Sequence, residues 1–465
     1  MGARLTAALL AGRMATGLSR RLGRGGGTVI AGHVVPRIDP TALRTVTRRL
    51  RHGSVLVSGT NGKTTTTRLI SHILKQAELL ALHNRAGANL VTGLVSAIVA
   101  QTDLAGWPRA DVGLFEVDEA TVPAALREIR PRAVLLTNIF RDQLDRYGEV
   151  HFVADLWAKA IRHLPQDTTL VLNADDPLVA TLGLGAAGQS RNAIYFGVGD
   201  ASVGSREVPH ASDARICPSC GTAFEYQVCY YGHLGAYACP NCGLARPEPT
   251  VEATGVTLRG DRGSEVVVRT PLGELRATLS LPGLYNVYNA LAATAVCLGL
   301  GLDPDTIKAG LESFIAAFGR LERVTVGDRE LFLALVKNPV GFGEVLRTIL
   351  TDRQERILVI AINDNFADGT DISWLWDVDF EQLEGHVGVA VCAGSRAEDM
   401  AVRLKYALVP EDRIVVEHDA RRALALALER AAPGETIYVL PTYTAMLELR
   451  EVLRQDGHVA GFWQD

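Results

Sequence analysis

The chain has 465 residues, of which 48% are hydrophobic and 21% are charged, so it can bury a full core but is too long for one ordinary domain. We therefore expect two or three domains. The 47 basic and 52 acidic side chains give a net charge of −5, which excludes the overall basic field of a general nucleic-acid binder. No run of 18 apolar residues is present, so no membrane-spanning helix is expected.

Residues 1–50 form a basic lead-in that contains the apolar run LTAALLAG. A signal peptide needs a longer apolar block and a cleavage site before the mature fold. We expect instead a helical lead-in with an amphipathic helix that makes peripheral contact with an anionic membrane surface. The expected location is the cytoplasm, with the inner face of the membrane as the more specific alternative.

Strand-like runs alternate with helical stretches from residue 51 onward, which predicts a doubly wound parallel sheet in an α/β domain over residues 51–321. Prolines and cysteines interrupt this pattern, and we expect an insertion at 213–246 followed by β-rich sequence. A second alternation predicts a C-terminal Rossmann-like α/β domain over 322–465. The predicted strands of the first domain lie at 54–59, 112–118, 133–139, 169–176 and 193–198.

The sharpest local motif is a phosphate-binding loop between a β-branched run and a helical stretch. Its glycines let backbone N–H groups face phosphate oxygens, its lysine places a positive charge beside the outer phosphates, and the hydroxyl of Thr64 is a ligand for Mg²⁺. The full motif would have glycine at position 57, where the chain has Val57, so only its second half matches. The candidate nucleotide-binding residues are Gly59, Thr60, Asn61, Gly62, Lys63, Thr64 and Thr65.

Acidic residues lie at the end of one later predicted strand and just past the end of the next, where α/β sheets bind ligands. They are Glu116 and Asp118, and then Asp142 and Asp145. Because Mg²⁺ on a nucleotide takes few protein oxygens, Glu116 is the best candidate for a second contact beside Thr64. For each of these acids, a helix cap or a plain surface charge is an equally good interpretation.

Two C-x-x-C pairs lie in the insertion, Cys217/Cys220 and Cys239/Cys242, each with glycine after the second cysteine. This spacing predicts a structural zinc site within a ribbon of about 30 residues, because four thiolates leave no open position for catalysis. Iron in a rubredoxin-like site is the alternative.

Several short motifs occur in a distinctive order along the chain: GTNGKTTT at 59–66, AGAN ending at Asn89, FEVDEA at 115–120, TNIFRDQLDRYGE at 137–149, LNADDP at 172–177, GLYNVYNALAA at 283–293 and GRLE at 319–322. This order resembles that of the Mur ligases, ATP-dependent amide-forming enzymes of peptidoglycan assembly. The resemblance implies ATP and Mg²⁺ as cofactors, with Lys63 and Thr64 at the phosphates, Glu116 at the metal, Asn286 and Asn289 near the nucleotide, and Arg320 on its phosphates.

Some positions depart from the Mur ligase pattern. Gln143 stands where many of these enzymes have histidine, which leaves the contact ascribed to that histidine in doubt. Lys159 lies near the position of the lysine that many of them carbamoylate, but the spacing leaves this open. The stretch before the phosphate loop is short for the domain that binds a uridine-diphosphate handle, so we expect an acceptor with another handle.

Three C-terminal motifs resemble the MurT family, the synthetase subunits of the enzyme that amidates lipid II: KNPVGFGEVL at 337–346, AINDNFADGTDISWLWDVDFE at 361–381 and LPTYTAML at 440–447. This resemblance implies a heterodimer with a GatD-like class I glutaminase, docked on the C-terminal domain, and lipid II as acceptor. It implies that ATP activates the α-carboxyl of D-glutamate as an acyl phosphate and that ammonia converts it to D-isoglutamine.

In that family the segment 361–381 lends an aspartate to orient the glutaminase histidine. Asp371 is the first candidate for this role and Asp368 the second. The alternative is that these acids are solvated loop residues that cap a helix over 371–377.

The remaining cysteines, Cys229, Cys297 and Cys392, lie in the insertion, in apolar helical sequence and at a strand end, so we interpret them as structural thiols. A glutaminase needs an activated cysteine, so the ammonia is expected from a partner. The alternatives left open are a folylpolyglutamate- or cyanophycin-type ligase, which adds an amino acid, and a non-catalytic nucleotide-binding zinc scaffold.

Overall fold

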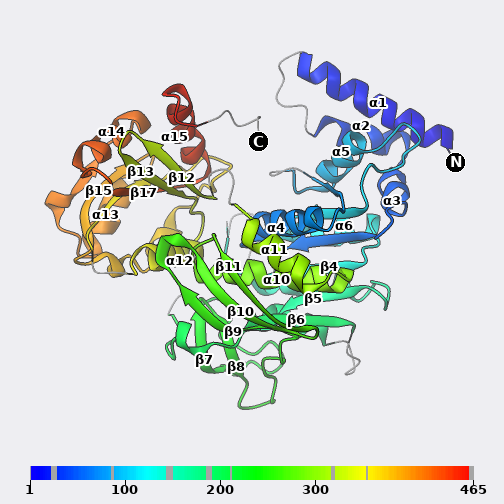
Figure 1. Ribbon diagram of the computed structural model, residues 1–465, viewed down its shortest axis with the longest axis horizontal. Helices are drawn as coiled ribbons and strands as arrows, with labels where there is room; N and C mark the ends of the chain where they lie inside the picture. Colours follow the sequence, from blue (N-terminus) through cyan, green and yellow to red (C-terminus); the bar gives the residue numbers. More distant parts are fainter. Residues whose placement is uncertain are drawn as a thin grey trace.

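The chain folds around two large β-sheets, which lie at opposite ends of the long axis of the molecule (Figure 1). The structure is a computed structural model, and it describes residues 2–21, 29–84, 88–142, 150–184, 191–209, 212–315, 320–351 and 354–459. Among these residues, no helix is long and apolar enough to cross a membrane.

The first sheet has nine strands in the order β11-β10-β9-β6-β5-β4-β1-β3-β2. Neighbouring strands are parallel throughout the part of the sheet that runs, in spatial order, from β2 at one edge to β9. Strand β10 runs antiparallel to both of its neighbours, β9 and β11. The β-rich sequence after the insertion therefore extends this sheet. The strands are β1 (Ser54–Ser58), β2 (Ala81–His83), β3 (Val112–Glu116), β4 (Ala133–Leu136), β5 (Thr169–Asn173), β6 (Ala193–Val198), β9 (Val251–Leu258), β10 (Ser264–Thr270) and β11 (Gly273–Leu279).

Helices cover both faces of this sheet, which explains why β1, β3 and β4 are buried along their whole lengths. Successive β1 residues alternate between two cores: Val55 and Val57 pack with the helices of one face, and Leu56 with those of the other. The first face carries α4 (Lys63–Gln76), α10 (Leu284–Leu300) and α11 (Pro304–Ser313), and the second carries α1 (Gly2–Arg21), α2 (Ile30–Ile38), α3 (Ala42–Thr47), α5 (Val91–Gln101), α6 (Val122–Glu128), α8 (Val150–Ile161) and α9 (Pro177–Ala180).

The second sheet has six strands in the order β12-β13-β17-β14-β15-β16, and only β12 is antiparallel to its neighbour. Helices α12 and α13 pack on one face, and α14 and α15 on the other. The elements are β12 (Arg320–Val326), β13 (Arg329–Ala334), α12 (Pro339–Ile349), β14 (Arg356–Ala361), β15 (Val387–Ala393), α13 (Ala397–Tyr406), β16 (Ile414–Val416), α14 (Ala420–Arg430), β17 (Thr436–Pro441) and α15 (Tyr443–Gln455).

The helix considered for residues 371–377 is only a short 3₁₀ turn, η6 (Ser373–Asp377). Leu375 is the residue of this turn that is buried, and no side-chain hydrogen bond caps its start at Ile372. The other 3₁₀ turns are η1 (Glu119–Thr121), η2 (Thr181–Gly183), η4 (Ala201–Val203), η5 (Gly260–Arg262), η7 (Phe380–Leu383) and η8 (Glu411–Arg413).

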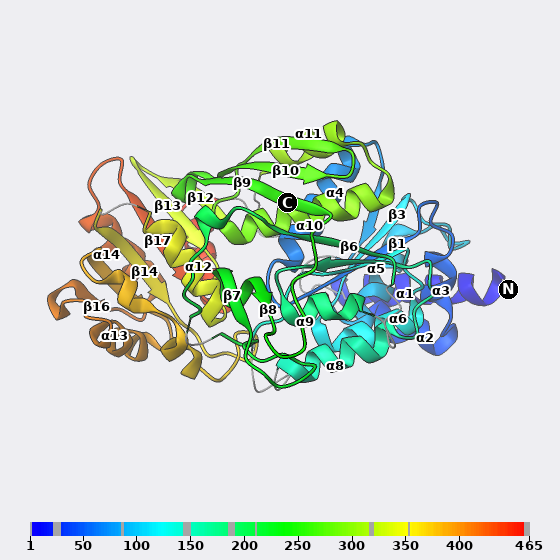
Figure 2. The same ribbon diagram turned by 90° about the horizontal axis from the view of Figure 1, so that it is seen from below.

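The insertion comes between β6 and β9 in the sequence and forms a separate hairpin of β7 (Glu225–Tyr231) and β8 (Leu234–Ala238) (Figure 2). Its turn packs against the end of β4: the rings of His233 and Phe140 lie 4.8 Å apart between centroids. From the second sheet, Arg347 of α12 donates a hydrogen bond to the carbonyl of Tyr230 at 2.7 Å. The hairpin therefore contacts both large sheet regions.

Candidate active site

The phosphate-binding loop connects β1 to α4, and its glycines have backbone conformations that other residues rarely adopt. Gly59 and Gly62 have φ angles of 145° and 84°. A Cβ atom on Gly62 would lie 2.1 Å from Oδ1 of Asn289. The loop therefore needs glycine at 62 both for its turn and for the close approach of α10, and it leads directly into the N-terminus of α4.

Lys63 is buried among carboxylates at this helix N-terminus. Its Nζ lies 3.0 Å from Oε2 of Glu119, a residue that the sequence did not single out. Burial by itself would lower the pKa of Lys63, but Glu119, Asp118 and Glu116 outweigh it and raise the pKa. Burial likewise opposes ionisation of Glu119, and Lys63 nonetheless holds its pKa below the ordinary value. Lys63 therefore stays charged, as an anion-binding group must.

Thr64 and Glu116, the two candidate Mg²⁺ ligands, lie in direct contact. The Thr64 hydroxyl donates to Oε1 of Glu116 at 2.9 Å, and Nδ2 of Asn89 donates to the same oxygen at 2.9 Å. Asn84 fixes the strand end by bonding both the backbone N–H and the carbonyl of Glu116. Oδ1 of Asn89 is buried and has no hydrogen-bond partner among the described residues. This oxygen-rich set fits Mg²⁺, which Thr64 and Glu116 would hold.

The second sheet contributes two residues to the phosphate loop. Lys337 donates to the carbonyl of Thr60 at 3.1 Å and forms an ion pair with Asp142. Asn338, the N-cap of α12, donates to Oδ1 of Asn61 at 3.0 Å. Lys337 and Asn338 lie in the motif KNPVGFGEVL, but the sequence pattern does not indicate their roles, because their partners are 277 residues away.

Asp142 is mostly buried beside Lys337, and burial raises the pKa of its carboxyl although Lys337 opposes the rise. Within the part of the chain that the structure describes, its Oδ1 has no hydrogen-bond partner. Asp142 thus lies beside the phosphate loop, whereas Asp145 and Gln143 fall outside the described residues. Lys159 lines a separate groove with Arg127 and does not reach the loop.

A pocket next to the phosphate loop is lined by Asn61, Gly62 and Thr65, and by Asn286 and Asn289 from α10. The two α10 asparagines are held in place, since Asn289 Nδ2 donates to Asn286 Oδ1 at 2.9 Å. The pocket adjoins the loop, as a nucleoside site must when the phosphates of the nucleotide lie on the loop. Its remaining walls include Leu321, Val340, Tyr231, Tyr285 and Glu344, and the side chain of Arg320 lies outside what the structure describes.

Asp368 and Asp371 line a neighbouring small cavity together with Asp142 and Lys337. Asp368 is buried, and its Oδ1 accepts a hydrogen bond from the backbone N–H of Thr444 at 2.7 Å. Asp371 is exposed and accepts from the N–H of Ser373 at 2.8 Å. The structure therefore distinguishes a structural position, Asp368, from an accessible one, Asp371.

The four cysteines of the insertion converge as the spacing predicted. All four Sγ atoms lie within 4.8 Å of one another, with Cys217 and Cys242 at 3.6 Å and Cys220 and Cys239 at 3.4 Å. A tetrahedron with Zn–S bonds of about 2.3 Å has S···S edges of roughly 3.8 Å, so the cluster fits such an ion. Both pairs use one local turn, in which glycine with a positive φ donates its N–H back to the first cysteine carbonyl.

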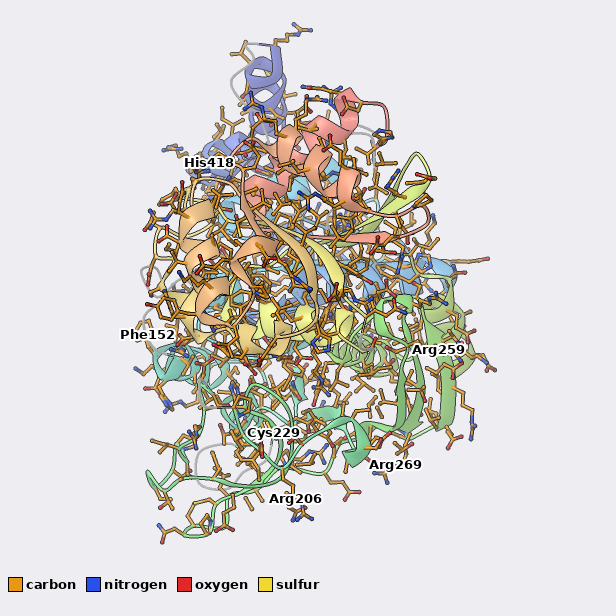
Figure 3. The ribbon with its side chains drawn as sticks, turned by 90° about the vertical axis from the view of Figure 1, so that its left-hand side faces the viewer. Phe152, Arg206, Cys229, Arg259, Arg269 and His418 are labelled. Carbon is orange, nitrogen blue, oxygen red and sulfur yellow. The ribbon has the colours of Figure 1, made fainter. Side chains whose placement is uncertain are left out.

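The other three thiols are poor nucleophiles. Burial raises the pKa of Cys229 and of Cys392 to about 12, and it raises the pKa of Cys297 further. None of the three therefore supplies the thiolate that a glutaminase requires at neutral pH. Figure 3 places Cys229 in the hairpin region at the lower part of the molecule.

Sequence comparisons match both halves of the chain to known families. Residues 57–237 match the Mur ligase middle domain, and residues 335–446 match the MurT ligase C-terminal domain. The MurT subunit of lipid II isoglutaminyl synthase (glutamine-hydrolyzing) from Staphylococcus aureus (strain N315) is 33% identical, over 95% of this chain and 96% of that protein. The Streptococcus pneumoniae (strain ATCC BAA-255 / R6) subunit of the same name is 36% identical, over 97% and 98%.

The chain belongs to the MurT family. A pseudomurein peptide ligase type C from Methanothermus fervidus shares the fold, with a TM-score of 0.67 at 22% identity over 91% of this chain and 84% of that one. The predicted family and α/β fold class are thus confirmed. As a MurT protein, the chain is an ATP-dependent ligase of the Mur type in peptidoglycan synthesis, and its family implies ATP and Mg²⁺.

Proposed function

We propose that this MurT protein amidates the α-carboxyl of D-glutamate in the stem peptide of lipid II, giving D-isoglutamine. A carboxylate oxygen of the acceptor attacks the γ-phosphorus of ATP, ADP leaves, and an acyl phosphate forms. Ammonia then attacks the carbonyl carbon, phosphate leaves with that oxygen, and a proton is lost. The observation that carries the proposal is full-length similarity to two lipid II isoglutaminyl synthase subunits, combined with the site formed by Lys63, Thr64 and Glu116.

The proposed nucleotide site uses the phosphate loop from Gly59 to Thr65, with Mg²⁺ on Thr64 and Glu116. The nucleoside would occupy the pocket beside Asn286 and Asn289, and Arg320 would contact the phosphates. Lys63 would stabilise the negative charge that develops on the transferred phosphoryl group, because its charge is fixed before the reaction. Residues 51–321 would form the ATP-binding domain.

Ammonia would come from a GatD-like class I glutaminase that docks on residues 322–465. The raised pKa values of Cys229 and Cys392 support a nitrogen source outside this chain. Asp371, exposed beside the small cavity, would orient the glutaminase histidine, with Asp368 as the second candidate. Zn²⁺ on Cys217, Cys220, Cys239 and Cys242 would stabilise the ribbon at 213–246 without entering the reaction.

The test is to purify the chain with the candidate glutaminase and to incubate the complex with lipid II, ATP and glutamine. Mass spectrometry is expected to show a loss of about one mass unit per stem peptide, because NH₂ replaces OH. A gain equal to an amino-acid residue would contradict amidation and favour an amino-acid-adding ligase. Unchanged lipid II and ATP would contradict a catalytic role.

A further inference from the structure

Helix α1 has two apolar faces, and the described residues cover only one of them. Leu5 and Leu9 are buried where α1 packs on α2 and α5. On the opposite face, Leu10, Met14 and Leu18 are 47%, 67% and 60% exposed. Their spacing of four residues places them in one stripe along the helix. Isolated exposed leucines are common, but an apolar stripe on an outer helix indicates a surface that something else covers.

The charge of this region indicates what covers it. Residues 1–51 contain ten arginines and one acidic residue, Asp39, which gives a net charge of +9 within a chain whose total is −5. The remainder of the chain is therefore acidic. Helix α1 itself has no acidic residue. Among the described arginines, those exposed around this region are Arg4, Arg21, Arg37, Arg48 and Arg51.

Two other occupants fit these observations less well. A second copy joined by a two-fold axis would bring the same patch onto itself, and two surfaces of high positive charge would repel each other. The proposed glutaminase would dock on the second sheet, whereas α1 lies at the other end of the molecule (Figure 1). Helix α1 also projects at the end opposite to the hairpin that carries Cys229 (Figure 3). The hairpin therefore does not cover the outward face of α1.

We propose that the outward face of α1 docks on an anionic lipid surface. Leu10, Met14 and Leu18 enter the headgroup region of the bilayer, and exposed arginines of residues 1–51 contact lipid phosphates. Stable peripheral binding takes two weak signals, and this region supplies both an apolar stripe and a polybasic surface. The docking surface is separate from the reaction centre, so it goes beyond the proposed function and is tested independently of it.

The test is co-sedimentation of the full complex with vesicles of phosphatidylglycerol and phosphatidylcholine, and with vesicles of phosphatidylcholine alone. The wild-type complex is expected to sediment with the anionic vesicles and to be released by salt. The triple substitution Leu10→Gln, Met14→Gln and Leu18→Gln is expected to weaken binding by about tenfold or more. The triple substitution Arg21→Gln, Arg48→Gln and Arg51→Gln is expected to have a similar effect.

Leu272→Gln is the matched control, because Leu272 is a 65% exposed leucine in the β10–β11 turn and should leave binding unchanged. ATP turnover with a short-chain, water-soluble acceptor reports folding and catalysis separately from docking. Absence of wild-type binding to anionic vesicles would overturn the proposal, as would full binding by the leucine–methionine variant. If the leucine–methionine variant no longer forms a dimer that the wild type forms, or no longer binds the glutaminase, the outward face of α1 binds a second copy or the glutaminase. Either result would also overturn the proposal.

Discussion

Asn338 at the start of α12 and Asn61 in the phosphate loop are joined amide to amide, with Asn338 Nδ2 donating to Asn61 Oδ1 at 3.0 Å. The preceding residue, Lys337, donates to the carbonyl of Thr60 at 3.1 Å. These contacts bring two residues from the second sheet region onto a loop of the first. The phosphate site is therefore built from both parts of the chain, and its geometry depends on how closely they approach.

Lys337→Met is expected to lower ATP turnover by the complex by roughly 10²- to 10³-fold, because a fixed positive charge beside the phosphates is lost. The KM for ATP should change much less. Since Asp142 would be left buried and unpaired, the double variant Lys337→Met/Asp142→Asn is measured as well, with thermal unfolding as a folding check. Exposed Lys405 offers the control Lys405→Met. Turnover within twofold of wild type in the folded double variant would remove Lys337 from the site.

Glu116→Gln is expected to raise the Mg²⁺ concentration needed for half-maximal ATP turnover by about tenfold or more, since a carboxylate is a much better Mg²⁺ ligand than an amide. The side chain keeps its size, and its Oε1 still accepts from Thr64 and Asn89. Excess Mg²⁺ should therefore restore part of the activity. Asp118→Asn is the control, and equal Mg²⁺ dependence in the two variants would show that Glu116 does not bind the metal.

The four-cysteine cluster is expected to hold one zinc ion per chain, measurable by elemental analysis of the complex. Cys217→Ser should lose the ion and lower the melting temperature, because the ribbon would lose its main internal constraint. The small packed cluster around the cysteines involves few apolar side chains, among them Phe224 and Tyr237. Cys229→Ser is the control outside the cluster. Visible absorbance from iron, or a metal-free protein with unchanged stability, would contradict the zinc assignment.

Local patterns predicted the parts of the fold and the site that depend on neighbours in sequence. The buried strands, the loop from Gly59 to Thr65 and the two cysteine turns all have short-range signatures. Long-range pairings had no such signature in the sequence. The contact between Glu119 and Lys63, and the contact between Lys337 and Asp142, form only when the sheets form. The β-rich sequence after the insertion also carried no signal for its partner strand. It joins β6 across the whole insertion.

Glu344 makes the stability of the nucleotide-free chain depend on pH. Burial raises the pKa of this carboxyl from its ordinary 4.5 to about 7, although Arg347 opposes the rise. Between these values the folded state keeps a proton that the unfolded state has released, so stability falls as pH rises from 4.5 through 7. Glu344→Gln should remove this contribution, which is about 3 kcal/mol at most. Melting temperatures at pH 5 and pH 8 test this, and an identical pH dependence in both proteins would contradict it.

Asp371→Asn and Asp368→Asn are expected to have different effects. Asp371→Asn should abolish most glutamine hydrolysis by the complex, because Asp371 is proposed to orient the glutaminase histidine. It should leave the melting temperature unchanged, because Asp371 is exposed. Asp368 accepts from the backbone N–H of Thr444 at the start of α15, so its substitution should cost about 1 kcal/mol of stability. Asp377→Asn controls for loss of charge in the same segment. Unchanged hydrolysis with Asp371→Asn would rule that residue out of the triad.

Transfer of an oxygen isotope tests the acyl phosphate most directly. Lipid II labelled with ¹⁸O in the α-carboxylate of D-glutamate is incubated with the complex, ATP and glutamine, and the inorganic phosphate is analysed by mass spectrometry. Activation as an acyl phosphate predicts one ¹⁸O atom in the phosphate for each amide formed, because the attacked carbonyl carbon releases that oxygen with the phosphoryl group. Amide formation with unlabelled phosphate would contradict the account.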